Sequence, residues 1–368
     1  MNSRYRIVPL SPTGCECIHF YYDVCPESPD GRRIVYFRFR DTVPGPGEVV
    51  VADRDGGNAR AVLAIDEPAD RHSAARQQWV DDDTISCCPG DGCRLRTTLV
   101  SLTDGTRRDL RGAARMISPK APLALTTLHD FQDLVAMTDD AVYLLDLRSG
   151  GVRPLFTVAE ALKLHPQGAD FPGSERVMFL HTKWSPGGAR FFVIASNVYR
   201  IGKEEQARRI NSVFVAEADG SGLRYLCEEY HHPVWGPDDD HVYCFRPSAT
   251  GGELGMKWWG GYQDLVSVPV AGGREEVVFS GLAGKHLCVS PDGRRVVADA
   301  THWPSSERAT IFIYTVGLGA PEAVLELTQR DFSQRGCHLH PTWARDGNRI
   351  YFNSMESGVR GLYALDLR

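Results

Sequence analysis

Four histidines occupy the same position in a repeating sequence pattern. Each stands three residues before a Trp or Val, and a turn signal follows that residue at once: His181–Gly188, His232–Asp239, His286–Gly293 and His340–Gly347. The intervals between the histidines are 51, 54 and 54 residues, so one structural unit recurs and presents an imidazole at an equivalent point. Imidazole nitrogens act as metal ligands and as bases near neutral pH. The spacing therefore predicts a site of metal or base chemistry near a common axis.

A further histidine extends this set. His338 stands two residues before His340, and alternate residues of a strand point to the same side, so both imidazoles can face one space. With His286 they make a three-nitrogen ligand set for Mn, Fe, Ni, Cu or Zn, with open positions for water or a substrate carboxylate. The alternative is a histidine that only hydrogen-bonds a neighbouring backbone carbonyl. For His181 and the His231–His232 pair both interpretations stay open.

The elements that must position these histidines are short strands. Runs such as 33–39, 190–195 and 349–353 are rich in β-branched and aromatic residues and are bounded by Gly, Pro and Asp. Hairpin signals such as Pro291–Gly293 separate them, and residues 157–163 are the one helical candidate. A period near 50 residues with four strands is typical of a β-propeller blade. A pair of β-sandwiches or a β-helix would not explain a Trp at a fixed phase.

Seven such units fit the chain, which predicts an all-β, seven-bladed β-propeller with four-stranded blades in a single domain over residues 1–368. The last unit is one strand short, whereas residues 4–9 form a spare strand. We therefore expect the N-terminal strand to complete the last blade and to remove two exposed edges. The expected blades cover residues 12–67, 68–112, 113–158, 159–228, 229–281, 282–330 and 331–368.

Composition excludes several classes of protein. A hydrophobic fraction of 42% and a charged fraction of 24% are typical of a soluble globular chain. The absence of a run of about 18 apolar residues argues against a membrane partner. The net charge of −6 argues against a nucleic-acid partner. No secretion signal is visible. We therefore expect the ten cysteines to be reduced thiols and the protein to be cytoplasmic. The oligomeric state stays open.

The repeated Ser-Pro-Asp-Gly blades resemble TolB-like propellers, whose signature is widely shared. The last three blades resemble more specifically those of oligogalacturonate lyases, and the resemblance covers roughly residues 175–368. That family is a seven-bladed propeller in which three histidines and a glutamine hold manganese, a further histidine acts as base, and an arginine serves the substrate. The matching segments are His232–Asp238, His286–Gly293 with Ala298–Asp299, and His338–Trp343 with Phe352–Ser354.

The resemblance implies a role for each matching position. The metal ligands would be His286, His338 and His340, with Gln334 as the fourth. The base would be His232, with His231 as its rival, and Arg208 or Arg209 would serve the substrate.

The spacing of Gln334 departs from the family pattern. It stands four residues before His338, whereas the family glutamine stands three residues before the first of the paired histidines. Either the loop absorbs one residue or water is the fourth ligand. A different uronate or another acidic substrate is then an alternative.

Two insertions and one histidine add candidate substrate-binding residues. Residues 256–262 carry Trp258 and Trp259, whose rings either stack on sugar faces or pack the insertion onto the propeller. Residues 199–209 carry Arg200 among four basic residues, and a solvated charged loop is the alternative interpretation. His181 lies in the same blade as this second insertion.

These features favour a metal-dependent polysaccharide lyase that cleaves short uronic-acid oligosaccharides by β-elimination. A divalent cation, with manganese first, would neutralise the substrate carboxylate, and a neutral histidine would remove the proton on the adjacent carbon. An arginine suits the carboxylate of an adjoining sugar. The alternative is a non-catalytic propeller that binds a protein partner or a carbohydrate on its face, and a hydrolase or isomerase that uses the same metal is a third possibility.

Overall fold

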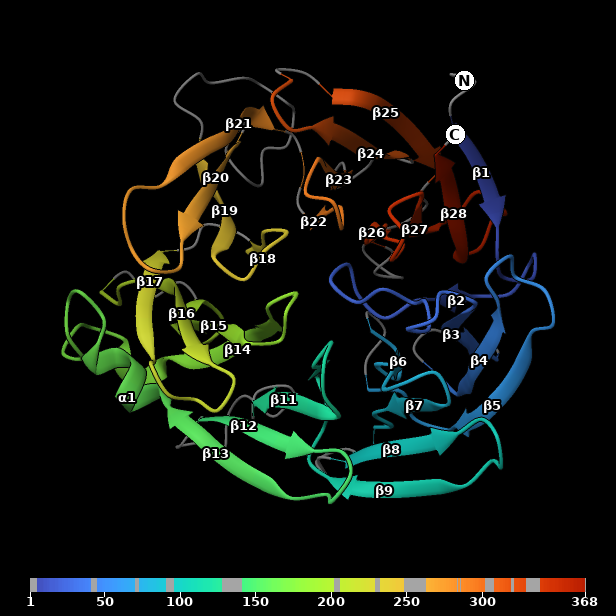
Figure 1. Cartoon of the computed structure of the whole chain (residues 1–368), viewed down its shortest axis with the longest axis horizontal. Helices are drawn as coiled ribbons and strands as arrows, with labels where there is room; N and C mark the ends of the chain where they lie inside the picture. The colour runs from blue at the N-terminus through green and yellow to red at the C-terminus, as the bar shows by residue number, and fades with distance from the viewer. Residues whose placement is uncertain are drawn as a thin grey trace.

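Antiparallel sheets that follow one another around a ring make up almost all of the regular structure (Figure 1). The computed structural model describes residues 5–40, 45–69, 73–90, 96–127, 141–201, 206–228, 232–247, 263–282, 284, 286–301, 308–318, 321–328 and 338–367. These residues form seven four-stranded sheets. The predicted seven-bladed β-propeller is confirmed. Within the same residues no helix has the length and apolar character needed to span a membrane.

Each of the first six blades takes its strands from one continuous stretch of chain, the innermost strand first. Blades 1 to 3 consist of β2 (Cys17–Ile18), β3 (Arg33–Phe39), β4 (Gly47–Asp53) and β5 (Arg60–Ile65); β6 (Gln78–Trp79), β7 (Thr84–Cys87), β8 (Arg96–Ser101) and β9 (Arg107–Arg111); and β10 (Met116–Ile117), β11 (Leu123–Thr127), β12 (Ala141–Asp146) and β13 (Val152–Thr157). Blades 4 to 6 consist of β14 (Met178–Trp184), β15 (Arg190–Ser196), β16 (Asn211–Glu217) and β17 (Arg224–Glu228); β18 (Val234–Trp235), β19 (His241–Pro247), β20 (Gln263–Pro269) and β21 (Glu276–Leu282); and β22 (Leu287–Val289), β23 (Arg295–Thr301), β24 (Arg308–Thr315) and β25 (Pro321–Thr328).

Blade 7 is built from both ends of the chain. It consists of β26 (Thr342–Trp343), β27 (Arg349–Ser354), β28 (Gly361–Leu367) and β1 (Tyr5–Pro9). The outermost strand, β1, runs antiparallel to β28, and the two ends of the chain lie side by side in Figure 1. An edge strand exposes unpaired backbone N–H and C=O groups. The pairing of β1 with β28 gives hydrogen-bond partners to the backbone groups on the facing edges of both strands. The predicted completion of the last blade by the N-terminal strand is confirmed.

A short polar turn ends the innermost strand of most blades. Between β22 and β23, the Ser290 hydroxyl donates to the Asp292 carboxylate (2.6 Å), and the Arg295 N–H donates to the Ser290 hydroxyl (2.9 Å). Gly293 has a φ of +70°, which glycine adopts without steric cost. Ser28 and Asp30 make the same contact in blade 1 (2.6 Å). The repeated turn fixes where the inner strand ends. It therefore also fixes the position along the propeller axis of the residues that precede the turn.

The fixed Trp phase has a structural cause. In four blades the indole N–H donates to a backbone carbonyl of the preceding blade, which joins the two sheets near the axis. The pairs are Trp79 to Pro26 (2.8 Å), Trp184 to Met116 (3.0 Å), Trp235 to Lys183 (2.9 Å) and Trp343 to Cys288 (3.1 Å).

At the seam between blades 7 and 1, a buried carboxylate replaces the indole. Glu27 precedes the Ser-Pro-Asp-Gly turn of blade 1 and is 1% exposed. Its carboxylate accepts from the Tyr351 hydroxyl (2.5 Å) and the Arg345 backbone N–H (2.9 Å), both in blade 7. It also pairs with Arg54 (2.7 Å). Charge-assisted hydrogen bonds of this kind are stronger than neutral ones, so the last contact of the ring is also a strong one.

The helical segments are short and lie outside the sheets. The predicted helix within 157–163 is α1 (Val158–Lys163), which Thr157 and Glu160 begin with a reciprocal capping box. The others are η2 (Ser174–Arg176) and α2 (Val198–Ile201).

Candidate metal centre

Three of the four phased histidines adopt an unusual backbone conformation. His181, His232 and His340 have φ values of +47°, +39° and +47°, in the left-handed region that few residues other than glycine occupy. His181 lies within β14, whose pairing with β15 is interrupted between Leu180 and Lys183. An interrupted ladder of this kind redirects a side chain. The same local geometry therefore presents an imidazole from blades 4, 5 and 7, and such strain is concentrated at functional sites.

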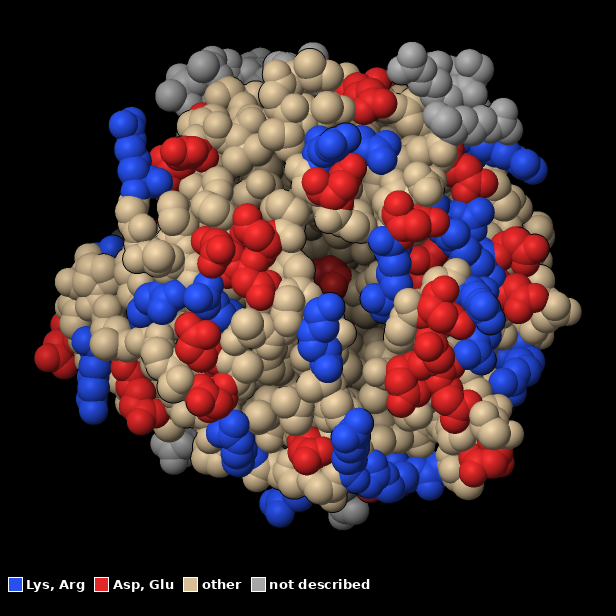
Figure 2. All heavy atoms as spheres, in the orientation of Figure 1, with Lys and Arg blue, Asp and Glu red and all other residues tan. Residues whose placement is uncertain are grey.

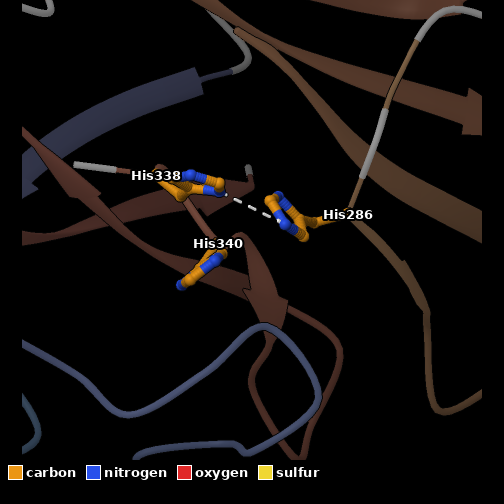
Figure 3. Close-up of side chains that lie close together, drawn as sticks. All are labelled: His286, His338 and His340. Atoms are coloured by element: carbon orange, nitrogen blue, oxygen red, sulfur yellow. Dashed lines mark hydrogen bonds between the residues drawn. The ribbon is translucent and has the colours of Figure 1, made fainter. Parts of the chain in front are cut away.

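Three buried imidazoles converge on one space. His286 reaches it from blade 6, and His338 and His340 reach it from blade 7 (Figure 3). One nitrogen of each ring lies within 4.8 Å of the others, and His338 Nδ1 is 3.3 Å from His286 Nε2. The ligating nitrogens of two imidazoles on one ion are at most about 4.2 Å apart, because each metal–nitrogen bond measures about 2.1 Å. Small side-chain rotations would therefore bring all three onto one ion.

The reason that His338 and His340 lie together differs from the expected one. Residues 338–340 precede β26 and are not part of a strand, so the alternation argument is wrong. The left-handed conformation of His340 brings the two rings to a centroid separation of 5.1 Å instead.

A buried carboxylate orients this cluster. Asp299, on β23, is 0% exposed and accepts from His286 Nδ1 (2.9 and 3.0 Å) and from the backbone N–H of His286 (3.1 Å). It also accepts from the backbone N–H of His340 (3.1 Å). Because an ionised carboxylate can only accept, the His286 proton lies on Nδ1 and the lone pair lies on Nε2. A carboxylate behind a histidine is the usual support of a metal ligand, so these residues fit a divalent ion.

Two tyrosines of blade 1 form one wall of the site. Tyr21 lies with its ring centroid 4.6 Å from that of His340 and 6.3 Å from that of His286. The Tyr22 ring lies 5.0 Å from His286 and 5.7 Å from His232. Both tyrosines are buried. They give the cluster an apolar boundary, which strengthens electrostatic interactions within it.

Below the tyrosines a buried lysine closes the channel. Lys183 Nζ donates to the Tyr22 hydroxyl (2.6 Å), the Pro233 carbonyl (2.8 Å) and the Asp23 carboxylate (3.0 Å). These contacts match the three donors of an ammonium group. Burial lowers the pKa of Lys183, whereas the nearby Asp23 charge opposes that shift. All three N–H donors of Lys183 are therefore used in contacts within the protein.

Beyond this lysine, the opposite end of the channel widens into a cavity of about 550 Å³. Trp184, Trp235 and Trp343 line it together with Asp23 and Lys183. These residues lie at the turn ends of the inner strands, away from the histidines. Figure 2 shows a hollow at the centre of the ring with acidic atoms at its floor, surrounded by intermixed charges of both signs.

Two further imidazoles lie beside the cluster. The His232 ring centroid is 5.0 Å from that of His286 and 5.5 Å from that of His181. His181 Nδ1 is 3.3 Å from Arg115 Nη2. Both histidines are partly exposed, whereas the three clustered imidazoles are buried. His232 and His181 therefore lie beside the cluster with part of their surface open to solvent.

The other candidate residues are placed less centrally or lie outside the described part. Arg208 and Arg209 are exposed on the segment between β15 and β16. Arg200, on α2, is partly buried. The candidates outside the described residues are His231, Trp258, Trp259 and Gln334.

Arg76 and Arg115 were not predicted from the sequence. Arg76 is buried, stands three residues before Trp79 and has a φ of +51°. In blade 2 this arginine therefore occupies the position that a histidine occupies in blades 4, 5 and 7. The Trp spacing alone could have identified it. Tyr21, Tyr22 and Arg115 do not share that phase.

His19 is another buried histidine near the cluster. Its ring centroid lies 6.4 Å from that of His340, and burial lowers its pKa to about 4. At neutral pH it is therefore an uncharged part of the packing.

Comparison with known proteins supports the fold. No protein-family model and no curated protein sequence matches this chain. A solved oligogalacturonate lyase from Vibrio parahaemolyticus matches with a TM-score of 0.69 and 12% identity, over 100% of this chain and 95% of that one. An oligogalacturonate lyase in complex with manganese matches with a TM-score of 0.69 and 14% identity, over 98% and 93%. The chain shares the fold of the oligogalacturonate lyases.

Propellers with other activities are also similar. The hydrazine synthase of Kuenenia stuttgartiensis matches with a TM-score of 0.54 and 13% identity, over 96% of this chain and 94% of that one. At these identities the likeness establishes the fold, and function has to be argued from the site.

Proposed function

We propose that this protein is a metal-dependent lyase that cleaves short uronic-acid oligosaccharides by β-elimination. The observation that carries the proposal is the buried cluster of His286, His338 and His340, oriented by Asp299. The shared fold supports it, because one of the similar oligogalacturonate lyases was solved with manganese.

The residues that would hold the ion are the three histidines, His286 through Nε2. Gln334 or a water molecule would be the fourth ligand. A divalent ion here supplies the positive charge that offsets the substrate carboxylate and makes the adjacent carbon-bound proton removable. The manganese-bound neighbour favours manganese, whereas three imidazoles also suit zinc or iron.

His232 is the proposed base. Its ring lies 5.0 Å from that of His286, and it is partly exposed, so it can meet a substrate that lies against the cluster. His232 takes the proton from the carbon next to the carboxylate. The electrons of that bond form the carbon–carbon double bond, and the glycosidic carbon–oxygen bond on the neighbouring carbon breaks. Its electron pair leaves with the oxygen of the departing sugar, which takes up a proton from water.

The remaining substrate contacts are proposals from the sequence. Arg200, Arg208 and Arg209 are candidates for the carboxylate of an adjoining sugar, since guanidinium binds carboxylate through two parallel hydrogen bonds. Trp258 and Trp259 are candidates for stacking on sugar faces, and His231 is the rival base.

The test is elimination by purified protein reconstituted with Mn²⁺ or Zn²⁺. Saturated digalacturonate and other saturated uronate dimers are mixed with it, and the ultraviolet absorbance of unsaturated uronates is followed with product chromatography. We expect an unsaturated product that chelator abolishes and that the His338→Ala variant fails to form. A protein that binds metal but produces no unsaturated product from any uronate would contradict the proposal. Absence of both metal and product would favour a non-catalytic binding propeller.

A further inference from the structure

Arg115 makes a contact that defines the chemistry of His181. Arg115 directly precedes β10 in blade 3, and its Nη2 lies 3.3 Å from Nδ1 of His181 on β14 in blade 4. A guanidinium has only N–H donors and keeps its proton at any ordinary pH. His181 Nδ1 must therefore be the acceptor. A neutral imidazole that accepts at Nδ1 carries its proton on Nε2.

The backbone of Arg115 is held by two hydrogen bonds, and its guanidinium lies against an aromatic ring. The Arg115 backbone N–H donates to the Leu125 carbonyl (3.0 Å), and its own carbonyl accepts from the Gln78 side chain of blade 2 (3.0 Å). The guanidinium carbon lies 5.8 Å from the centre of the Tyr21 ring. That ring is stacked on His181 with an interplanar angle of 14° and a centroid separation of 6.2 Å. Arg115, Tyr21 and His181 thus form a packed stack, so the contact is part of the frame.

The position of the proton on His181 gives this histidine a different chemical role from the neighbouring His232. The rings of His181 and His232 lie 5.5 Å apart, and each alone could be a base. On His181, Nδ1 is occupied by a guanidinium N–H and Nε2 already carries a proton. Neither nitrogen can accept a proton from a substrate while Arg115 is in place. Toward a substrate, His181 can therefore only donate a hydrogen bond, through Nε2–H.

We propose that Arg115 is a positioning residue that fixes the Nε2–H form of His181, and that His181 donates a hydrogen bond to an anionic substrate oxygen while His232 acts as base. The substrate part of this inference rests on the proposed lyase function, whereas the form of His181 does not. The donors on this side of the site, one imidazole N–H and one guanidinium, suit carboxylate or sugar oxygens.

The first arm of the test measures where the His181 proton lies. The full chain is labelled with ¹⁵N-histidine, loaded with Zn²⁺ as a diamagnetic ion, and studied by long-range ¹H–¹⁵N correlation, with His181→Asn to assign the signals. We expect a protonated Nε2 and an unprotonated Nδ1 in the unaltered protein. Arg115→Lys keeps this pattern because an ammonium also donates, and Arg115→Met converts it to a mixture. Arg111→Met removes an exposed cation nearby and leaves the pattern unchanged.

A proton on Nδ1 in the unaltered protein, or a pattern that Arg115→Met leaves unchanged, overturns the inference. Neither outcome depends on catalysis. A protein that lacks lyase activity but shows the Nε2–H form therefore defeats the proposed function and keeps the assignment of Arg115.

The second arm separates the two histidines by kinetics on saturated digalacturonate with Mn²⁺. We expect His181→Asn to raise KM and Arg115→Met to lower kcat/KM by about tenfold, the loss that one charge-assisted hydrogen bond produces. His232→Asn should abolish kcat. Loss of kcat in His181→Asn with normal turnover in His232→Asn would reverse the roles and refute the inference.

Discussion

At the scale of single residues, Asp299 is the support on which the cluster depends. It accepts hydrogen bonds from the ring and the backbone of His286 and from the backbone of His340. One carboxylate thus orients a proposed ligand, His286, from blade 6 and the segment that carries another, His340, from blade 7.

Replacement of Asp299 by Asn should weaken metal binding without removing a ligand. The amide cannot match the carboxylate as an acceptor from His286 Nδ1, so the Nε2 lone pair is less securely presented to an ion. Loss of such a partner costs about 10- to 100-fold in metal affinity. Calorimetric titration of the metal-free protein with Mn²⁺ and with Zn²⁺ measures the change, and an affinity equal to that of the unaltered protein would show that Asp299 has only a structural role.

Replacement of His338 by Ala should lower the metal content of the purified protein. It removes one of three clustered imidazoles, whereas His241→Ala removes a partly exposed histidine of β19 and serves as the matched control. Elemental analysis after dialysis against limiting Mn²⁺ gives the stoichiometry. An unchanged stoichiometry in His338→Ala would refute the ligand set.

Replacement of His232 by Ala should abolish turnover while the metal content persists. His232 lies beside the cluster but is not one of its three members, so its loss removes the proposed base and leaves the ligands. Initial rates of unsaturated product and elemental analysis of the same sample measure the two quantities. Turnover close to that of the unaltered protein would rule out His232 as base and favour His231.

At the scale of elements, the inner strands do two jobs at two ends. One end presents histidines, and in four blades the other end carries the indole that joins the blade to the preceding one. Trp235 Nε1 donates to the Lys183 carbonyl at 2.9 Å, and Lys183 in turn closes the channel below Tyr22. The stability of the ring and the shape of the site therefore share the same strands.

Replacement of Trp235 by Phe should destabilise the protein by about 1–3 kcal/mol, because it leaves the buried Lys183 carbonyl without its indole donor. Trp184→Phe should cost a similar amount, since it removes the equivalent bond to Met116. Tyr143→Phe, at a partly exposed position of β12, is the conservative control. Urea unfolding midpoints compare the variants, and a Trp235→Phe midpoint equal to that of the control would refute the role of this bond.

The sequence predicted the histidine positions because blades 4 to 7 repeat one turn with a Trp or Val at a fixed distance before it. A constant spacing in the chain then corresponds to an equivalent position in each blade. Arg76 follows the same rule but is an arginine, so a pattern defined by histidine did not include it. Tyr21, Tyr22 and Arg115 reach the site from segments of blades 1 and 3 that lie outside this phase. Their proximity depends on the closure of the ring, which local spacing does not encode.

At the scale of the whole molecule, ring closure places buried titratable groups in the interior. Glu27 joins blades 7 and 1, and His19 lies near it in the chain with its ring beside that of His340. A buried histidine of this kind makes the stability of the ring depend on pH.

Acidification should destabilise the metal-free protein, in part through His19. The unfolded chain binds the His19 proton with a pKa near 6.5, whereas burial lowers the pKa in the folded protein to about 4. Stability is therefore complete above pH 6.5 and falls as the pH approaches 4, by roughly 3 kcal/mol for this one group. Denaturant unfolding between these pH values should show a shallower dependence in His19→Gln, and an identical slope would exclude His19 as a contributor.

The position of β1 has a consequence for how the protein is made. During translation β1 leaves the ribosome before every other strand of the ring, yet its partner β28 emerges after all of them. His338 and His340 also belong to the last blade to be synthesised, and the partner ligand His286 waits in the blade before it. A nascent chain shorter than 340 residues therefore lacks part of the histidine cluster, and β1 finds its partner only after β28 has been synthesised.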